Sequence, residues 1–149
     1  MGATPEQIHE MFSCCMGFAR TMLEQAGDFY PFGATLAADG VVAAVGGDNG
    51  EERPNPIEIY KLLSDAFVAG ALNGQFAGVA LAANVNIPAQ YSPTAPDGLR
   101  IQLESSGYAR YVYVPYRVKK EGIFKKKIVV EFDEPFSVDI AANFFVSTS

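Results

Sequence analysis

The stretch 28–46 constrains the fold of this chain most, because it is typical of a β-hairpin. Two apolar segments, about 32–38 and 41–46, flank the dipeptide Asp39-Gly40. Asp-Gly favours a two-residue type I′ turn, whose central residues both have positive φ. Neither segment alternates apolar with polar residues, which predicts strands that are buried on both faces or closely covered by a helix. Small residues such as Gly33 would let another element pack closely there.

Two amphipathic helices are predicted, one on each side of this hairpin in the sequence. Thr4-Pro5-Glu6-Gln7 has a capping threonine, a proline at the first helical position and the glutamine of a capping box, and Gly27 suits the helix end. Asn55-Pro56-Ile57-Glu58 repeats the start signal, and Asn73-Gly74 closes the second helix. The apolar residues of the first helix recur three or four positions apart: Ile8, Met11, Phe12, Cys15, Ala19, Met22, Leu23 and Ala26.

The pattern after the second helix predicts strands. The segment 76–87 is apolar and rich in alanine, as expected for a central strand, and a proline-containing loop follows at 88–98. The period then becomes two, which is typical of a strand with two different faces. Leu99, Ile101 and Leu103 form one face of this strand, and Arg100, Gln102 and Glu104 form the other.

Turns at 105–107 and 119–122 predict a three-stranded antiparallel meander. Pro115 in its middle strand requires an edge position or a bulge, because proline has no N–H. Phe124 is expected to share a face with the other apolar residues of the last strand, and 138–146 fits either a short strand or a helical turn. The three strands of the meander are predicted at about 99–104, 108–118 and 123–132.

These elements predict a single α+β domain over residues 1–149, in the order α-β-β-α-β-β-β-β. Its sheet is mostly antiparallel and is covered by the two helices. A chain of 149 residues buries roughly two thirds of the surface that its unfolded form exposes. Hydrophobic residues make up 49% and charged residues 19%, which argues against a disordered chain.

Charge and targeting signals favour a cytoplasmic protein without a membrane span. The net charge of −6 disfavours bulk attraction to nucleic acid. Its concentration in residues 1–99 fits either self-association with the mildly basic remainder or a simple contribution to solubility. The first seven residues lack the basic and apolar regions of a secretory signal. Residues 66–96 carry no charge, but polar residues, glycine and proline interrupt the run.

The sequence offers few groups for catalysis, so we predict no catalytic residue, no metal and no cofactor. His9 is the single histidine, and the common zinc motifs are absent. The acidic stretch 48–52 lacks the spacing of a calcium loop. Cys15 lies on the apolar stripe of the first helix, and the adjacent Cys14 has no base on its helical face.

Polar residues beside predicted turns form the candidate ligand-binding set, Tyr30, Tyr91, Glu104 and Arg110, together with Asp28. They would line a small-molecule site if the fold brought them together. A carboxyl group held in an apolar cleft can act as a general acid, so Glu104 with Tyr30 and Arg110 is the candidate set for an enzyme.

The meander also carries tyrosines and cations. Tyrosine with arginine or lysine can hold single-stranded nucleic acid by stacking and phosphate contact. Alternatively, lysines protect an edge strand while tyrosines pack with their hydroxyls in water, and the acidity of the chain favours this second interpretation. Tyr111, Tyr113, Arg117 and Lys119 share one face of the strand, and Tyr108, Arg110 and Tyr116 share the other.

Two resemblances accompany these patterns. Phe29-Tyr-Pro-Phe-Gly-Ala with Asp39-Gly40, and Leu103-Glu104 with Pro115-Tyr116, resemble motifs of small bacterial proteins in families of unknown function. The helix–hairpin–helix–strand order is similar to that of the cytidine-deaminase-like fold. The second helix, however, opens Asn55-Pro56-Ile57-Glu58 and lacks the His/Cys-x-Glu and Pro-Cys-x-x-Cys motifs of that fold, so deaminase activity is not implied.

The leading hypothesis is a non-catalytic, cytoplasmic protein-interaction or sensor-type domain that forms a homodimer. The alternative is a small-ligand binder, or a metal-independent enzyme that uses carboxylates and tyrosines. Weak nucleic-acid binding through the meander is the third.

Overall fold

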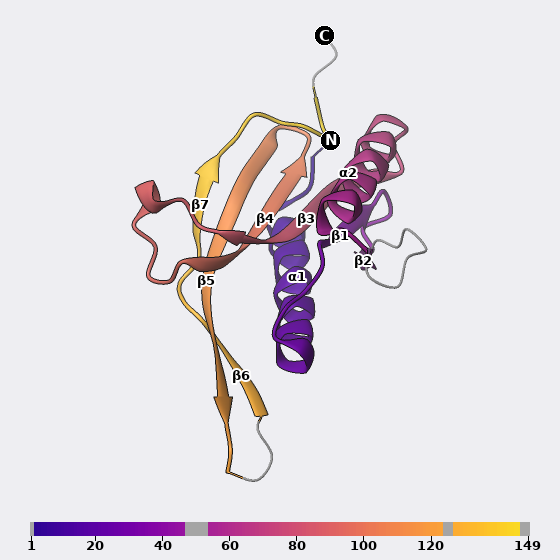
Figure 1. The fold of residues 1–149 in the computed structure, drawn as a ribbon. Coiled ribbons are helices and arrows are strands. Elements are labelled where there is room, and N and C mark those ends of the chain that lie inside the picture. Colours follow the sequence, from indigo (N-terminus) through magenta and orange to yellow (C-terminus); the bar gives the residue numbers. More distant parts are fainter. Residues whose placement is uncertain (1, 47–53, 124–126, 147–149) are drawn as a thin grey trace.

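The computed structural model describes residues 2–46, 54–123 and 127–146, and in them it has two long helices and a curled antiparallel sheet (Figure 1). The strand order is β2-β1-β3-β4-β5-β6, and β7 also pairs with β5. The predicted α+β class and element order are confirmed, with β7 as a further strand. The elements are α1 (Pro5–Ala26), β1 (Phe32–Ala37), β2 (Val42–Gly46), α2 (Pro56–Leu72), β3 (Phe76–Asn86), the 3₁₀ turn η1 (Ala89–Tyr91), β4 (Asp97–Ser105), β5 (Tyr108–Glu121), β6 (Lys127–Phe132) and β7 (Phe136–Asp139).

Both helices begin as predicted. The Thr4 hydroxyl accepts a bond from the Gln7 N–H, and the Gln7 side chain returns one to the Thr4 N–H, which completes the capping box. Gly27 ends α1 with φ +74°. Asn55 caps α2 by accepting from the Ile57 N–H. Neither helix in the described residues is long and apolar enough to cross a membrane.

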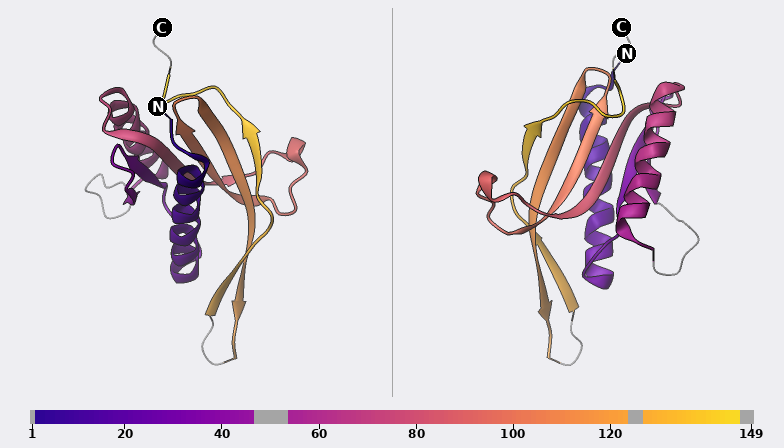
Figure 2. Two further views of the ribbon diagram at one scale, coloured as in Figure 1. Left: turned by 180° about the vertical axis from the view of Figure 1, so that it is seen from behind. Right: turned by 45° about the horizontal axis from the view of Figure 1, so that its top comes forward.

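The two helices cover opposite faces of the sheet (Figure 2). Alternation along β3 decides this, because Ala80 and Ala82 pack in the α1 core while Val79 and Leu81 pack in the α2 core. Close packing at Gly33 is confirmed, since a Cβ there would lie 2.7 Å from the Phe67 ring. The residues that α1 buries are Met11, Cys15, Ala19 and Leu23, and those that α2 buries are Ile59, Leu63, Phe67 and Gly70.

The hairpin forms, but its turn is not type I′. Only Gly40 has positive φ, at +94°, and its N–H bonds to the Ala37 carbonyl while the Ala37 N–H bonds to the Val41 carbonyl. This is a three-residue loop with a glycine bulge, which suits Asp39 because its φ stays negative. Burial on both faces is correct for β1 and wrong for β2, because β2 is an edge strand with exposed Ala43 and Ala44.

Pro115 lies inside a strand that is paired on both sides, β4 on one and β6 and β7 on the other. Its carbonyl accepts from the Asp133 N–H, so its ring nitrogen faces the same side. Residues 133–135 on that side belong to no strand. The missing donor therefore falls at the gap between β6 and β7, and the expected conflict with a central position does not arise.

The predicted turn at 119–122 is wrong, because β5 continues to Glu121 and forms with β6 a two-stranded extension alongside α1 (Figure 1). The prediction for Phe124 lies outside the described residues, as does that for 48–52. The undecided segment 138–146 contains the end of β7 and then irregular chain. Both ends of the described chain reach the end of β4, where Ser105 accepts from the Ala3 N–H and Glu104 accepts from the Asn143 N–H.

Candidate functional site

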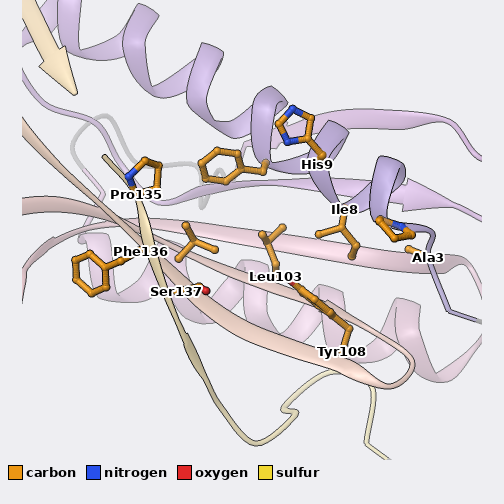
Figure 3. Close-up of a pocket in the computed structure, with 11 residues that line it drawn as sticks. Ala3, Ile8, His9, Leu103, Tyr108, Pro135, Phe136 and Ser137 are labelled. Carbon is orange, nitrogen blue, oxygen red and sulfur yellow. The ribbon is translucent and has the colours of Figure 1, made fainter. Parts of the chain in front are cut away.

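An apolar cavity of about 440 Å³ lies between the start of α1 and the edge of the sheet formed by β4, β5 and β7 (Figure 3). The bond between the Ala3 N–H and the Ser105 hydroxyl, 2.7 Å, holds the start of α1 over the end of β4. Ile8 and Phe12 of the helical stripe line the cavity opposite residues of β4, β5 and β7. The lining residues are Ala3, Pro5, Ile8, His9, Phe12, Leu103, Tyr108, Val112, Pro135, Phe136 and Ser137.

The polar groups of this cavity lie on two sides. His9 is exposed on α1, and its Nε2 is 3.4 Å from the Ser13 hydroxyl one turn along. On the sheet, the Ser137 hydroxyl accepts from Arg110, 3.4 Å away, and the Arg110 guanidinium lies 5.5 Å from the ring of Tyr108. An apolar interior with a few polar groups at its margin is the usual composition of a small-molecule site.

A second hollow, of about 630 Å³, contains Tyr30 of the predicted set, 43% exposed, together with Asp28. The Asp28 carboxylate accepts from the Asn84 amide at 2.8 Å, and Asn84 accepts from the Tyr116 hydroxyl at 2.7 Å. Burial raises the pKa of Tyr116, and the bond to Asn84 partly opposes this. The lining residues are Met22, Ala26, Asp28, Phe29, Tyr30, Pro31, Pro54, Pro56, Ala83 and Asn84.

Glu104 does not line an open cleft, and its hydrogen bonds are to other parts of the fold. It is fully buried, and its carboxylate accepts from the backbone N–H groups of Asn143, Phe144 and Phe145 at 2.9 to 3.4 Å. The Gln102 amide, also buried, donates to its other oxygen. Glu104 thereby holds the C-terminal segment across the sheet, where Phe144 packs beside α2.

A polar chain continues from Glu104 along the same face of β4. The Tyr60 hydroxyl of α2 donates to the side-chain amide oxygen of Gln102 at 3.4 Å and accepts from Arg100 at 3.0 Å. The half-buried Arg100 guanidinium lies 4.6 Å from the Tyr111 ring centre and 5.8 Å from that of Tyr60. Its Nε is buried and has no hydrogen-bond partner in the described part of the chain.

The four predicted ligand-binding residues have different neighbours. Tyr30 borders the second hollow, and Glu104 lies beneath the C-terminal segment. Tyr91 in η1 packs on Tyr113, with ring centres 5.5 Å apart. Arg110 forms an exposed ion pair with Asp139 of β7 at 3.1 Å. The expected convergence of these residues on one cleft is not what the structure has.

Three cations of β5, namely Arg110, Arg117 and Lys119, contact acidic side chains. Arg117 contacts Asp133 at 2.9 Å, and Lys119 contacts Glu131 at 3.0 Å. Arg110 is likewise paired with an aspartate. Such pairing reduces the positive potential that a nucleic-acid phosphate would meet.

The described residues do not favour a metal site or a reactive cysteine. No group of three or more His, Cys, Asp or Glu side chains that could hold an ion occurs there. Cys15 is buried as predicted, and burial raises its pKa far above the ordinary thiol value. Burial and the Glu10 carboxylate raise the pKa of Cys14, which disfavours its thiolate.

Sequence reasoning left Arg100 and Tyr60 out of the candidate set. The alternation on β4 predicts a polar row, but it does not by itself predict that this row is buried. A signal was available, because a strand paired with a central, doubly buried β3 also has both faces near the core. Polar residues in such a strand need internal partners.

Three comparisons with known proteins add no relative. No family model, curated protein or solved structure matches the chain. The resemblances to families of unknown function and to the cytidine-deaminase-like fold therefore stay predictions.

Proposed function

We propose that this chain is a non-catalytic, sensor-type domain that binds a small apolar molecule in the cavity beside α1. The observation that carries the proposal is the cavity itself, about 440 Å³ with a mainly apolar lining. Its volume falls in the range of about 300–1,000 Å³ that is typical of small-molecule sites. Binding of an apolar ligand in the cavity is favourable because it removes this apolar surface from water.

The groups at the cavity margin favour binding over catalysis. His9 and Ser13 are the one serine–histidine contact near the cavity in the described residues, and both are exposed on a single helix at 3.4 Å. A working nucleophile needs a base that is itself oriented by a third group. His9 instead has an aromatic neighbour, Phe12, at 6.4 Å between ring centres.

Binding of an uncharged, apolar fluorescent probe, N-phenyl-1-naphthylamine, tests this proposal. Val112→Phe fills the cavity and should weaken binding at least tenfold. Val118→Phe is the matched control, since Val118 lies on the same strand but outside the lining and should leave binding unchanged. Equal binding by both variants, with native circular dichroism, would remove the cavity as the site.

The second part of the proposal is a homodimer formed through β2. This edge strand carries no charge from Gly40 to Gly46, and Val41 is 58% exposed. The Val41 carbonyl bonds to β1, so alternation directs the backbone groups of Val42 and Ala44 to the open edge. A second copy related by a two-fold axis presents the same edge antiparallel, which satisfies both strands at once.

Light scattering after gel filtration tests the dimer. The wild-type chain should be dimeric at micromolar concentration, and Ala44→Pro should be monomeric because it removes an outward N–H without touching the ladder to β1. Ala44→Thr keeps that N–H and should stay dimeric. A monomeric wild-type chain would overturn the dimer and leave the cavity proposal intact.

A further inference from the structure

Arg100 differs from the other described arginines. Arg20, Arg110 and Arg117 each have a carboxylate within 4 Å. Arg100 has no ion pair in the described residues, although it is half-buried and its Nε is shielded from water. A guanidinium that loses water without gaining an anion is electrostatically unfavourable, so a missing counter-ion is a reason to look for a ligand.

The groups around Arg100 hold it in place but do not neutralise it. Tyr60 accepts one N–H, and the rings of Tyr60 and Tyr111 lie within 6 Å of the guanidinium carbon. The nearest carboxylate along the polar chain, that of Glu104, is already bonded to three backbone N–H groups and to Gln102. Donors therefore remain on the guanidinium for another acceptor.

Aromatic side chains continue this site along the sheet. Tyr91 and Phe136 both pack on Tyr113, with ring centres 5.5 and 5.3 Å away. The ring centres of Tyr111 and Tyr113 are 6.1 Å apart, and the Tyr111 ring also lies beside the Arg100 guanidinium. Tyr113 is buried, whereas Tyr91 and Tyr111 are partly exposed, so a planar apolar group next to an anion would contact these two rings in a way that a bare inorganic ion would not.

We propose that Arg100, in the frame of Tyr60, Tyr111 and Tyr113, binds a small molecule that carries an aromatic ring and a carboxylate. A carboxylate is favoured over a phosphate because the site has a single cation and because the planar guanidinium pairs with two carboxylate oxygens side by side. This site lies on the α2 face of the sheet and the apolar cavity lies on the α1 face, with Phe136 of β7 bordering both.

The test is a titration of the ¹⁵N-labelled protein with benzoate, followed through the arginine Nε–H signals and by calorimetry. Benzoate should shift the Arg100 signal saturably, whereas the neutral analogue benzamide should not. Arg100→Gln should weaken benzoate binding at least tenfold. Arg117→Gln, which removes a β5 cation that is paired with Asp133 and lies outside both sites, should leave benzoate binding unchanged.

Several results would overturn the proposal. They are the absence of a saturable shift in the wild-type chain, equal affinity in Arg100→Gln, and tighter binding of inorganic phosphate than of benzoate. Loss of benzoate binding in Val112→Phe but not in Arg100→Gln would place the ligand in the cavity instead. If Arg100→Gln does not fold, Arg100→Lys is the alternative. It keeps the positive charge but lacks the paired N–H donors of the guanidinium, so it should still weaken benzoate binding.

Discussion

The two faces of β4 are both buried, but different interactions stabilise them. Leu99, Ile101 and Leu103 pack under α1 in an apolar core, which is stabilised by buried contact area without hydrogen bonds between side chains. Gln102 and Glu104 on the other face are 1% and 0% exposed, and their burial depends on hydrogen bonds from α2 and the C-terminal segment. The comparison teaches that one strand can carry an adaptable apolar face and a polar face that tolerates little change.

The largest effect is expected on the α1 face. Ile101→Ala should lower the free energy of unfolding by about 2–5 kcal/mol, because it leaves a cavity among fully buried side chains. Urea denaturation measures this loss. Ile123→Ala is the matched control, because Ile123 is 91% exposed and its truncation should change stability by about 0.5 kcal/mol or less. Similar losses in the two variants would contradict the position of the core.

On the opposite face, Glu104→Gln should cost about 1–3 kcal/mol, because the amide replaces a charged acceptor that serves three N–H groups. The effect should be local as well as global. Hydrogen exchange at Asn143, Phe144 and Phe145 should accelerate more than exchange in β3. Glu131→Gln, at an exposed ion pair, serves as the control. Unchanged protection of the three amides would show that Glu104 does not anchor the segment.

Alkaline pH should weaken the fold as well. Burial raises the pKa of Tyr60, Tyr113 and Tyr116 in the folded chain above the ordinary value of about 10. As the pH rises past that value, the unfolded chain releases protons that the folded chain keeps, so the free energy of unfolding falls. Below pH 10 these groups should cause no change. Urea titrations between pH 8 and 11 measure the slope, which Tyr116→Phe should reduce.

Local signals explain what could be predicted from the sequence. Thr4, Gln7 and Asn55 define helix starts through bonds to backbone groups a few residues away, so their pattern is sufficient. The turn at Asp39-Gly40 needed the register of both strands, which one dipeptide does not contain. The environment of Glu104 depends on residues 143–145, about 40 positions along the chain, and no local pattern contains that contact.

The candidate site shows the same division between local and distant information. Glu104 and Arg110 are both polar residues beside a turn in the sequence, yet one is fully buried and the other forms an exposed pair with Asp139. The apolar cavity requires α1, β5 and β7 together, elements that only the tertiary fold brings side by side. Periodicity predicts which face of an element is apolar, but not which part of that face stays uncovered.

The smallest effect is expected at the ion pair between Lys119 and Glu131, which sharpens the contrast with Arg100. Both side chains are about half exposed, 52% and 48%, so water screens their attraction. A double-mutant cycle with alanine at both positions should give a coupling of about 0.2–1 kcal/mol that decreases as salt is added. A larger, salt-independent coupling would mean that the β5–β6 extension depends on its charges. A small coupling would set this pair apart from Arg100, which lies beside Tyr111 and whose buried Nε has no hydrogen-bond partner in the described residues. Arg100 would then be the cation for which a bound anion matters most.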